Sequence, residues 1–252
     1  MERISSGKNP KIQLIRSLYH AKGRAEHAAF LAEGEHLTEE ANQHCEILFI
    51  AVEESCAEKY SHLLAGHAVV LVESRLFKSI SETVSPQGIC AVCRIQERRQ
   101  THTHLLLLNG VQDPGNVGTM IRTADAAGFD VILDKGCADI YNPKTIRSSM
   151  GSLFHIACRK TEALAEEIQS RKEEGYRVYA AALGGSAFFE RGEDAKKLAI
   201  VIGNEGKGID PDIQSICTDI FELPMPGQAE SLNAGVAAAI MMYDVIRQAK
   251  EK

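Results

Sequence analysis

Residues 221–243 of the chain, FELPMPGQAESLNAGVAAAIMMY, combine a strand, a loop and a helix in one stretch. Apolar residues alternate at Phe221, Leu223 and Met225 ahead of a proline-rich loop, as in a short strand that ends at a turn. Ser231 precedes an alanine-rich run and is the predicted helix N-cap. A helix N-terminus presents unpaired backbone N–H groups, so the loop before it is a candidate ligand site. A capped helix with no ligand is the simpler interpretation of this stretch taken alone.

The same strand–loop–helix order recurs through residues 105–252 and predicts a parallel α/β sheet. The predicted strands are continuously apolar, which is typical of a parallel sheet covered on both faces. These strands are 105–108, 131–133, 155–158, 178–182, 198–202 and 220–223. The predicted helices are 117–127, 145–150, 163–172, 211–217 and a long one from Ser231. Ligands of such sheets normally bind beyond the carboxyl ends of the strands.

The first 95 residues predict a smaller α/β domain with a mostly parallel, covered sheet. Its predicted strands are 47–52, 69–72 and 89–95. Its predicted helices are 11–22, 35–43, 57–64 and 75–83. Residues 96–104, QERRQTHTH, are polar and lack a period, so they form the predicted linker. The predicted domains are therefore residues 1–95 and 105–252.

Composition predicts a cytoplasmic protein without a membrane partner. The chain of 252 residues is 44% hydrophobic and 25% charged, as in ordinary globular proteins. Its apolar runs fall far short of the roughly 20 residues that span a bilayer. The first residues, MERISSGKNPKIQ, lack the apolar core of a secretory signal. Seven cysteines, an odd number, suit a reducing compartment better than a disulfide framework.

Positive charge is concentrated at the N-terminal end, although the whole chain has a net charge of −6. Within the first 24 residues the only acidic residue is Glu2. The basic residues there are Arg3, Lys8, Lys11, Arg16, Lys22 and Arg24. This excess predicts either a solvated basic helix or a local patch that binds phosphate groups.

A zinc site near the linker is considered and not expected. Cys90 and Cys93 form a lone CxxC, followed by His102 and His104. No second cysteine pair lies at a suitable spacing, and both cysteines fit a strand as small apolar residues. We therefore expect no metal.

Three loops of the second domain carry the candidate site. They are LNGVQDPGNVGTMIRTADAAG at 108–128, VIGNEGKGI at 201–209, and residues 221–243. In the first loop Asn116 is the predicted cap of a helix that displays Arg122. Glycine-rich loops after strands allow a ligand to approach the backbone closely.

Two common nucleotide-binding motifs are excluded by spacing. In a P-loop the lysine is followed by serine or threonine, whereas Lys207 is followed by Gly208. The glycines of the second loop are also not spaced as GxGxxG and do not follow the first strand. With these two motifs excluded, the sequence predicts a small-molecule site formed by loop backbone and five polar side chains. These are Asn116, Arg122, Glu205, Ser231 and Asn233.

Taken together, the three loops closely resemble the motifs of the SpoU branch of the SPOUT superfamily, the S-adenosylmethionine-dependent RNA 2′-O-ribose methyltransferases. The matching segments are GTMIRTADAAGFD, IGNEGKG and LPMPGQAESLNAGVAAA, in that order. The opening segment NPKIQLIRSL also resembles the RNA substrate-binding domain that many of these enzymes carry, a small α/β/α sandwich. The resemblance spans nearly the whole chain and implies a deep trefoil knot in the second domain.

The resemblance also implies roles for individual residues. S-adenosylmethionine is expected to contact Gly203, Leu223 and Leu232 through backbone, with Leu183, Met225 and Ser231 close by. Arg122 is the implied catalytic residue, in a site that the second subunit of a homodimer completes. A guanidinium rarely loses its proton, so Arg122 acts either as a base or by gripping a phosphate and polarising the hydroxyl.

The remaining polar residues have implied supporting roles. Asn116 would orient Arg122 or the ribose, and Glu205 would hold its loop and contact the partner subunit. Ser231 and Asn233 would bind the substrate phosphate or the cofactor carboxylate at the helix N-terminus. Lys8, Lys11, Arg16, Lys22 and Arg24 would bind RNA.

The predicted function is methyl transfer to a ribose 2′-hydroxyl, with ribosomal RNA favoured over transfer RNA. Two alternatives stay open. One is an RNA-binding protein whose methyltransferase domain is inactive, and the other is a base-modifying enzyme of the same superfamily. The intact polar residues argue against the first, and the match to the ribose-modifying branch argues against the second.

Overall fold

The structure is a computed structural model that describes residues 2–250, and the chain forms two compact units. The first unit runs to Gln96 and takes in Tyr141–His155. The second unit holds Glu97–Ile140 and the chain from Ile156 onward. None of the helices in the described part of the chain is long and apolar enough to cross a membrane.

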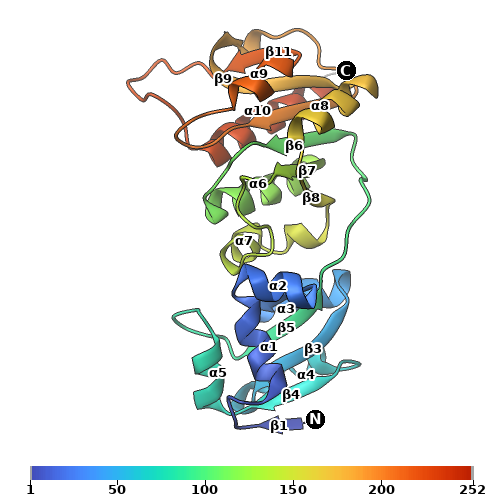
Figure 1. Cartoon of the computed structure of the whole chain (residues 1–252), viewed down its shortest axis with the longest axis vertical. Coiled ribbons are helices and arrows are strands. Elements are labelled where there is room, and N and C mark those ends of the chain that lie inside the picture. Colours follow the sequence, from blue (N-terminus) through green and yellow to red (C-terminus); the bar gives the residue numbers. More distant parts are fainter. Residues whose placement is uncertain (1, 251–252) are drawn as a thin grey trace. The chain divides into compact units, whose positions relative to one another are not determined.

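The first unit is built on a five-stranded mixed sheet with the order β1-β4-β3-β5-β2 (Figure 1). Three of its strands are parallel: β1 (Glu2–Ile4), β4 (Val69–Val72) and β3 (Ile47–Glu53). β5 (Ile89–Arg94) is antiparallel to both β3 and β2 (Ala29–Glu33). β2 therefore runs in the same direction as β1, β3 and β4, and β5 alone is reversed. The expectation of a mostly parallel sheet fails only for β5, because a buried strand has the same apolar pattern in either direction.

The helices of this unit differ from the predicted ones mainly at two places. The predicted helix 11–22 is two helices, α1 (Pro10–Leu18) and α2 (Ala21–His27). Their close crossing requires Gly23, where a Cβ atom would lie 2.2 Å from the carbonyl oxygen of Ser17. The predicted helix 57–64 shrinks to a single turn. The remaining helices of residues 1–96 are α3 (Glu35–His44), η1 (Glu54–Cys56), α4 (Ser61–Leu64) and α5 (Ser74–Ile80).

A segment from the second half of the chain belongs to the first unit, which the sequence does not predict. Tyr141–His155 contains α7 (Pro143–Ser149) and η2 (Ser152–Phe154). Phe30 of β2 stacks on Tyr141 with ring centroids 5.0 Å apart and lies 5.5 Å from Phe154. These aromatic contacts join segments more than a hundred residues apart, so no local pattern signals them.

The second unit is built on a parallel sheet of six strands with the order β11-β9-β10-β6-β7-β8 (Figure 1). The strands are β6 (His104–Leu108), β7 (Phe129–Asp134), β8 (Cys158–Thr161), β9 (Arg177–Ala187), β10 (Leu198–Ile202) and β11 (Asp219–Glu222). The predicted parallel α/β fold is confirmed. The predicted strand 155–158 is displaced, because the observed β8 is a polar edge strand that begins where the apolar run ends.

Helices cover both faces of this parallel sheet. All five residues of β10 are buried, as expected for a central strand. The helices α8 (Leu164–Glu173) and α9 (Pro211–Ile216) pack together over one core, which includes Ala199 and Val201. The helices α6 (Pro114–Ala127) and α10 (Ala234–Lys250) also pack together, and α10 contacts β10. The predicted trefoil knot stays a prediction.

Candidate active site

A cavity of about 670 Å³ lies beyond the carboxyl ends of β10 and β11 in the second unit. Its walls come from residues 181–183 of β9, the end of β10 and the loop 203–209, residues 221–223 and 230–234 on either side of the proline-rich loop, and two further residues of α10. All six residues predicted to bind the cofactor line it, although their role stays a prediction. These residues are Leu183, Gly203, Leu223, Met225, Ser231 and Leu232.

Leu183 reaches the cavity because β9 is irregular. The partners of β11 shift from Ala180 to Ser186 between Ile220 and Phe221, so residues 181–185 leave the ladder. Gly185 lies so close to β11 that a Cβ atom would be 2.5 Å from the carbonyl oxygen of Ile220. Leu183 is consequently 68% exposed although it lies within a strand. The glycine pair 184–185 is the sequence signal of this bulge.

The loop after β10 is tight and presents its backbone to the cavity. Asn204 and Gly208 exchange two backbone hydrogen bonds of 2.9 Å, and Gly208 adopts a φ of +73°. The side chain of Asn204 accepts hydrogen bonds from the N–H groups of Gly206 and Lys207 at 2.9 and 3.0 Å. At Gly203 a Cβ atom would lie 2.2 Å from the carbonyl carbon of Gly208. The loop can close only with glycine at position 203.

Three side chains from the three loops form one hydrogen-bonded chain. Asn116 Nδ2 donates to Glu205 Oε1 at 2.9 Å, and Asn233 Nδ2 donates to Asn116 Oδ1 at 3.0 Å. Glu205 also accepts from the backbone N–H groups of Gln112 and Asp113, both at 3.3 Å. The structure thus brings together three of the five predicted polar residues.

These contacts set the ionisation of Glu205. Partial burial raises the pKa of its carboxyl group, but hydrogen bonds from Asn116 and from backbone N–H groups outweigh burial and hold the pKa below its ordinary value. Glu205 is therefore an anion at neutral pH and can only accept hydrogen bonds.

Two predicted helix caps are wrong. α10 begins at Ala234, and Asn233 caps it: its Oδ1 accepts from the N–H groups of Gly235 and Val236 at 2.9 and 3.3 Å. Ser231 precedes the cap by two residues and lines the cavity instead. α6 is capped by Asp113 rather than Asn116, because Pro114 starts the helix. Both errors have the same cause, since several cap-forming residues lie close to the start of each helix.

Arg122 lies in the middle of α6, where its side chain is exposed. It forms no hydrogen bond or ion pair with any of residues 2–249. The side chain of Asn116 therefore does not bond that of Arg122, and the expected contact between these two residues is not observed. An unpaired guanidinium on the surface is available to an anion from outside the chain.

The predicted RNA-binding residues have unequal surroundings. Lys8 and Lys22 are exposed, Lys11 pairs with Glu2 at 2.8 Å, and Arg16 donates to Ser79 at 3.2 Å. Arg24 is only 3% exposed, and its Nη1 donates to the carbonyl oxygen of Leu18 at 2.7 Å. Arg24 stabilises the end of α1, so it leaves the proposed RNA-binding set.

Sequence reasoning missed a buried asparagine that supports the loops. Asn109 directly follows β6 and is 2% exposed. Its Nδ2 donates to Asp134 at 2.7 Å and to Asp210 at 3.0 Å, and its Oδ1 accepts from the N–H group of Asp210 at 2.7 Å. Asn109 therefore ties the end of β7 to the start of α9. Asn109 and Asp134 directly follow the apolar strands 105–108 and 131–133, and this position could have indicated from the sequence that they interact.

The fold and cavity define an α/β protein with a ligand site at the carboxyl ends of parallel strands. Comparison with known proteins makes the assignment narrower. The pattern of the SpoU rRNA methylase family matches residues 103–243, and that of the MRM3-like substrate-binding domain matches residues 9–91. The chain belongs to the SpoU rRNA methylase family, and the predicted family and enzyme class are confirmed.

Individual relatives match over nearly the whole chain. The chain is 40% identical over 245 residues to 23S rRNA (guanosine(2553)-2′-O)-methyltransferase RlmP of Bacillus subtilis, covering 96% of this chain and 98% of the relative. A solved S-adenosylmethionine-bound rRNA methyltransferase from Sinorhizobium meliloti is 28% identical, with a TM-score of 0.84 and coverage of 98% and 97%. A solved RNA 2′-O-ribose methyltransferase is 29% identical, with a TM-score of 0.82 and coverage of 98% and 99%.

Proposed function

We propose that this enzyme transfers a methyl group from S-adenosylmethionine to a ribose 2′-hydroxyl of large-subunit ribosomal RNA. The observation that carries the proposal is the hydrogen-bonded chain of Glu205, Asn116 and Asn233, which joins the three loops beside one cavity. The name of the Bacillus subtilis relative specifies guanosine 2553 of 23S rRNA, so the equivalent nucleotide is the first one to test.

The cavity fits S-adenosylmethionine in size and chemistry. Its volume of about 670 Å³ is in the range of small-molecule sites. Gly203 and the following loop offer backbone groups without an intervening side chain, which suits hydrogen bonding to a base or ribose. Leu183, Leu223 and Leu232 supply apolar surface for an adenine ring. When bound, the cofactor supplies an activated methyl group on a sulfonium.

The residues of this chain would position the acceptor. Because the donor is already reactive, catalysis depends on alignment and on removal of the hydroxyl proton. The exposed guanidinium of Arg122 is suited to grip an RNA phosphate and to polarise the neighbouring 2′-hydroxyl. Asn116 and Asn233 hold the loops in register, and Ser231 at the cavity wall can donate to a carboxylate.

The first unit would bind the RNA substrate. Its N-terminal segment keeps exposed positive charge at Lys8 and Lys22, with Lys11 and Arg16 at partly exposed positions. Phosphate contacts of this kind give affinity without sequence specificity. Ribosomal RNA as substrate also supports a cytoplasmic location. Transfer RNA is the second choice of substrate.

We also propose a homodimer through the second unit, with the trefoil knot that the resemblance implies. Val236 and Tyr243 of α10 are 49% and 52% exposed and lie seven residues apart, on one face of the helix. Leu232, 39% exposed, extends this apolar row just ahead of the helix. A second subunit would cover the row and supply the surroundings that Arg122 lacks in one chain.

The test is to map ribose methylation across ribosomal and transfer RNA from cells with and without the enzyme. We expect one 2′-O-methyl group in 23S rRNA to disappear and to return with the wild-type chain, but not with Arg122→Ala. Loss at a transfer RNA position alone would change the substrate, and loss of a base methyl group would favour the base-modifying alternative. If no RNA changed and calorimetry detected no binding of S-adenosylmethionine, the proposal would be wrong. The protein would then be an RNA-binding protein whose methyltransferase domain is inactive.

A further inference from the structure

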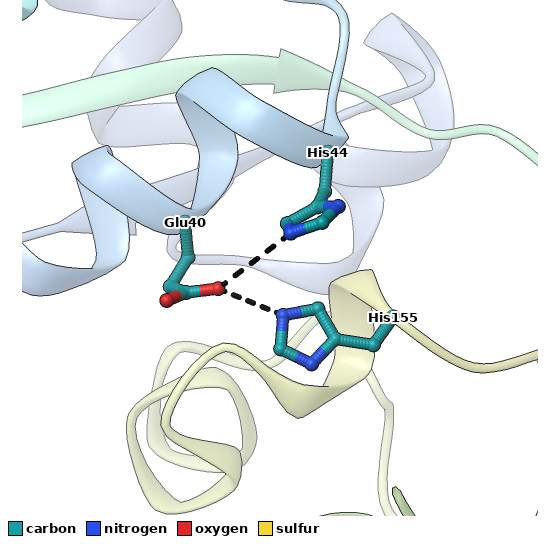
Figure 2. Close-up of side chains that lie close together, drawn as sticks. All are labelled: Glu40, His44 and His155. Atoms are coloured by element: carbon teal, nitrogen blue, oxygen red, sulfur yellow. Dashed lines mark hydrogen bonds and ion pairs between the residues drawn. The ribbon is translucent and has the colours of Figure 1, made fainter.

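Glu40, His44 and His155 bring a carboxylate and two imidazoles together within the first unit (Figure 2). Glu40 and His44 are one turn apart on α3 and share a face of that helix. His155 directly follows η2, far along the chain. One possible ligand atom from each residue lies within 4.8 Å of the other two. We propose that these three side chains bind a divalent transition-metal ion, with zinc as the first choice.

The distances are close to those of a tetrahedral site. Glu40 Oε2 lies 2.7 Å from His155 Nε2 and 4.0 Å from His44 Nε2 (Figure 2). Ligand atoms about 2.0–2.1 Å from a tetrahedral zinc ion lie roughly 3.3 Å from one another. The two separations from Glu40 lie on either side of this value, and the ligand atoms of the two histidines lie within 4.8 Å of each other, so small side-chain rotations would bring the three atoms to tetrahedral spacing. Binding through Nε2 would displace the proton that lies between Oε2 and Nε2, and the neutral imidazole of His155 would then carry its proton on Nδ1.

The ligand set selects the class of metal. Two imidazole nitrogens and one carboxylate suit zinc, copper or nickel, whereas magnesium and calcium prefer oxygen ligands alone. Three protein ligands leave a fourth position for water. Within residues 2–249, no other group of three such side chains has comparable spacing.

Local packing holds the ligands in place. The side chain of Glu40 lies against Gly151, where a Cβ atom would be 2.6 Å from Glu40 Cγ. The rings of His44 and His155 meet edge to face with centroids 4.6 Å apart. The nearby ring of His36 hydrogen-bonds the carbonyl oxygen of Met150 at 3.2 Å. A bound ion would therefore fasten the segment Tyr141–His155 to α3, in addition to the aromatic contacts of Phe30.

The test measures metal binding by the full-length protein with Co²⁺ and Zn²⁺ salts, without RNA or S-adenosylmethionine. We expect one ion per chain by calorimetry, and a visible cobalt spectrum typical of nitrogen and oxygen ligands. His155→Ala and Glu40→Gln should each weaken binding by about tenfold or more. Zinc should raise the midpoint of thermal unfolding of the wild type, and should raise that of Glu40→Gln by less at the same zinc concentration, because stabilisation by a ligand falls as its affinity falls.

Two variants serve as controls. His67→Ala removes a half-buried histidine that also bonds a side chain of α3, Asn42, at 2.6 Å, and should bind metal as the wild type does. Cys45→Ser tests whether the neighbouring thiol is a ligand, and should also bind normally. Wild-type affinity in Glu40→Gln or His155→Ala, or a thiolate-to-cobalt absorption band that Cys45→Ser removes, would overturn the proposal. Neither result would bear on methyl transfer, which this experiment does not use.

Discussion

Asn116 and Asn233 are joined by a side-chain hydrogen bond of 3.0 Å although 117 residues separate them along the chain. The ionised carboxylate of Glu205 can only accept, so the amide nitrogen of Asn116 must face it. The amide oxygen of Asn116 then faces Asn233 and accepts a hydrogen bond from the amide nitrogen of Asn233. The oxygen of Asn233 is left for the first N–H groups of α10. One charged group thereby fixes the orientation of two amides and the start of the terminal helix.

Replacing Asn233 separates its two roles. Asn233→Asp keeps an oxygen to cap α10 but removes the donor to Asn116, so we expect stability within about 0.5 kcal/mol of the wild type. Methyl transfer should fall about tenfold or more, equivalent to about 1.4 kcal/mol of lost positioning. Asn233→Ala should lose both the cap of α10 and the hydrogen bond to Asn116, and its free energy of unfolding should fall by about 1 kcal/mol. Thermal unfolding and single-turnover methyl transfer measure the two effects.

Ser231→Ala is the matched control for the capping role, because Ser231 lies ahead of the cap. It should leave the stability of the fold unchanged. If Ser231→Ala destabilised the protein as much as Asn233→Ala, the assigned cap would be wrong.

The lowered pKa of Glu205 predicts how the stability of the fold changes in acid. Its pKa in the folded protein is held below the ordinary value of 4.5 by hydrogen bonds that outweigh burial. Its contribution to stability is therefore fully present above pH 4.5 and is lost as the pH falls through the lower folded value. The stability difference between the wild type and Glu205→Gln should be constant near neutral pH and shrink below pH 4.5. Denaturant unfolding over this range measures it, and a difference that grew with acidity would contradict the assignment.

The sequence predicts the second unit better than the first for a physical reason. The strand 198–202 is predicted and observed with the same limits, because a central parallel strand is apolar throughout. The direction of β5 is not encoded in its own residues, since a strand covered on both faces has one pattern in either orientation. The placement of Tyr141–His155 depends on the stacking of Phe30 on Tyr141, a contact between distant segments.

The candidate site shows the same division between local and distant information. The glycines of the loop 201–209 are visible in the sequence, and so is their consequence, a tight turn beside a strand. The cap of α10 could not be chosen among neighbouring polar residues, because Asn233 is selected by its bond to Asn116 as well as by its helix. The resemblance to a family supplied the residue roles that spacing alone could not.

Gly203→Ala tests whether the loop after β10 can tolerate a side chain. The added Cβ atom would lie 2.2 and 2.3 Å from backbone atoms of Gly208 and Ile209, so the loop must shift. We expect a loss of stability of about 1–3 kcal/mol and much weaker binding of S-adenosylmethionine. Thermal unfolding and calorimetry provide the two measurements.

Gly206→Ala is the control within the same loop. The nearest atom to a Cβ there is Asn204 Oδ1 at 3.7 Å, an ordinary contact. This variant should unfold as the wild type does. Equal destabilisation of the two variants would mean that the loop needs glycine for general flexibility rather than for the close approach at position 203.

Arg122 distinguishes two chemical roles in methyl transfer. Arg122→Ala should keep wild-type stability within about 0.5 kcal/mol, because the exposed side chain has no partner in residues 2–249. It should also keep cofactor binding, but slow transfer by roughly a hundredfold or more.

Arg122→Lys retains a positive charge and loses the bidentate geometry that binds phosphate. If Arg122 acts by binding phosphate and polarising the hydroxyl, the lysine variant should keep part of the activity with an unchanged pH–rate profile. If Arg122 is instead the general base, the rate rises with pH as the base loses its proton, and lysine, which titrates at lower pH, should move this ascending limb to lower pH. Transfer rates measured between pH 6 and pH 10 for the three proteins decide between the roles, and we expect the profile to stay in place.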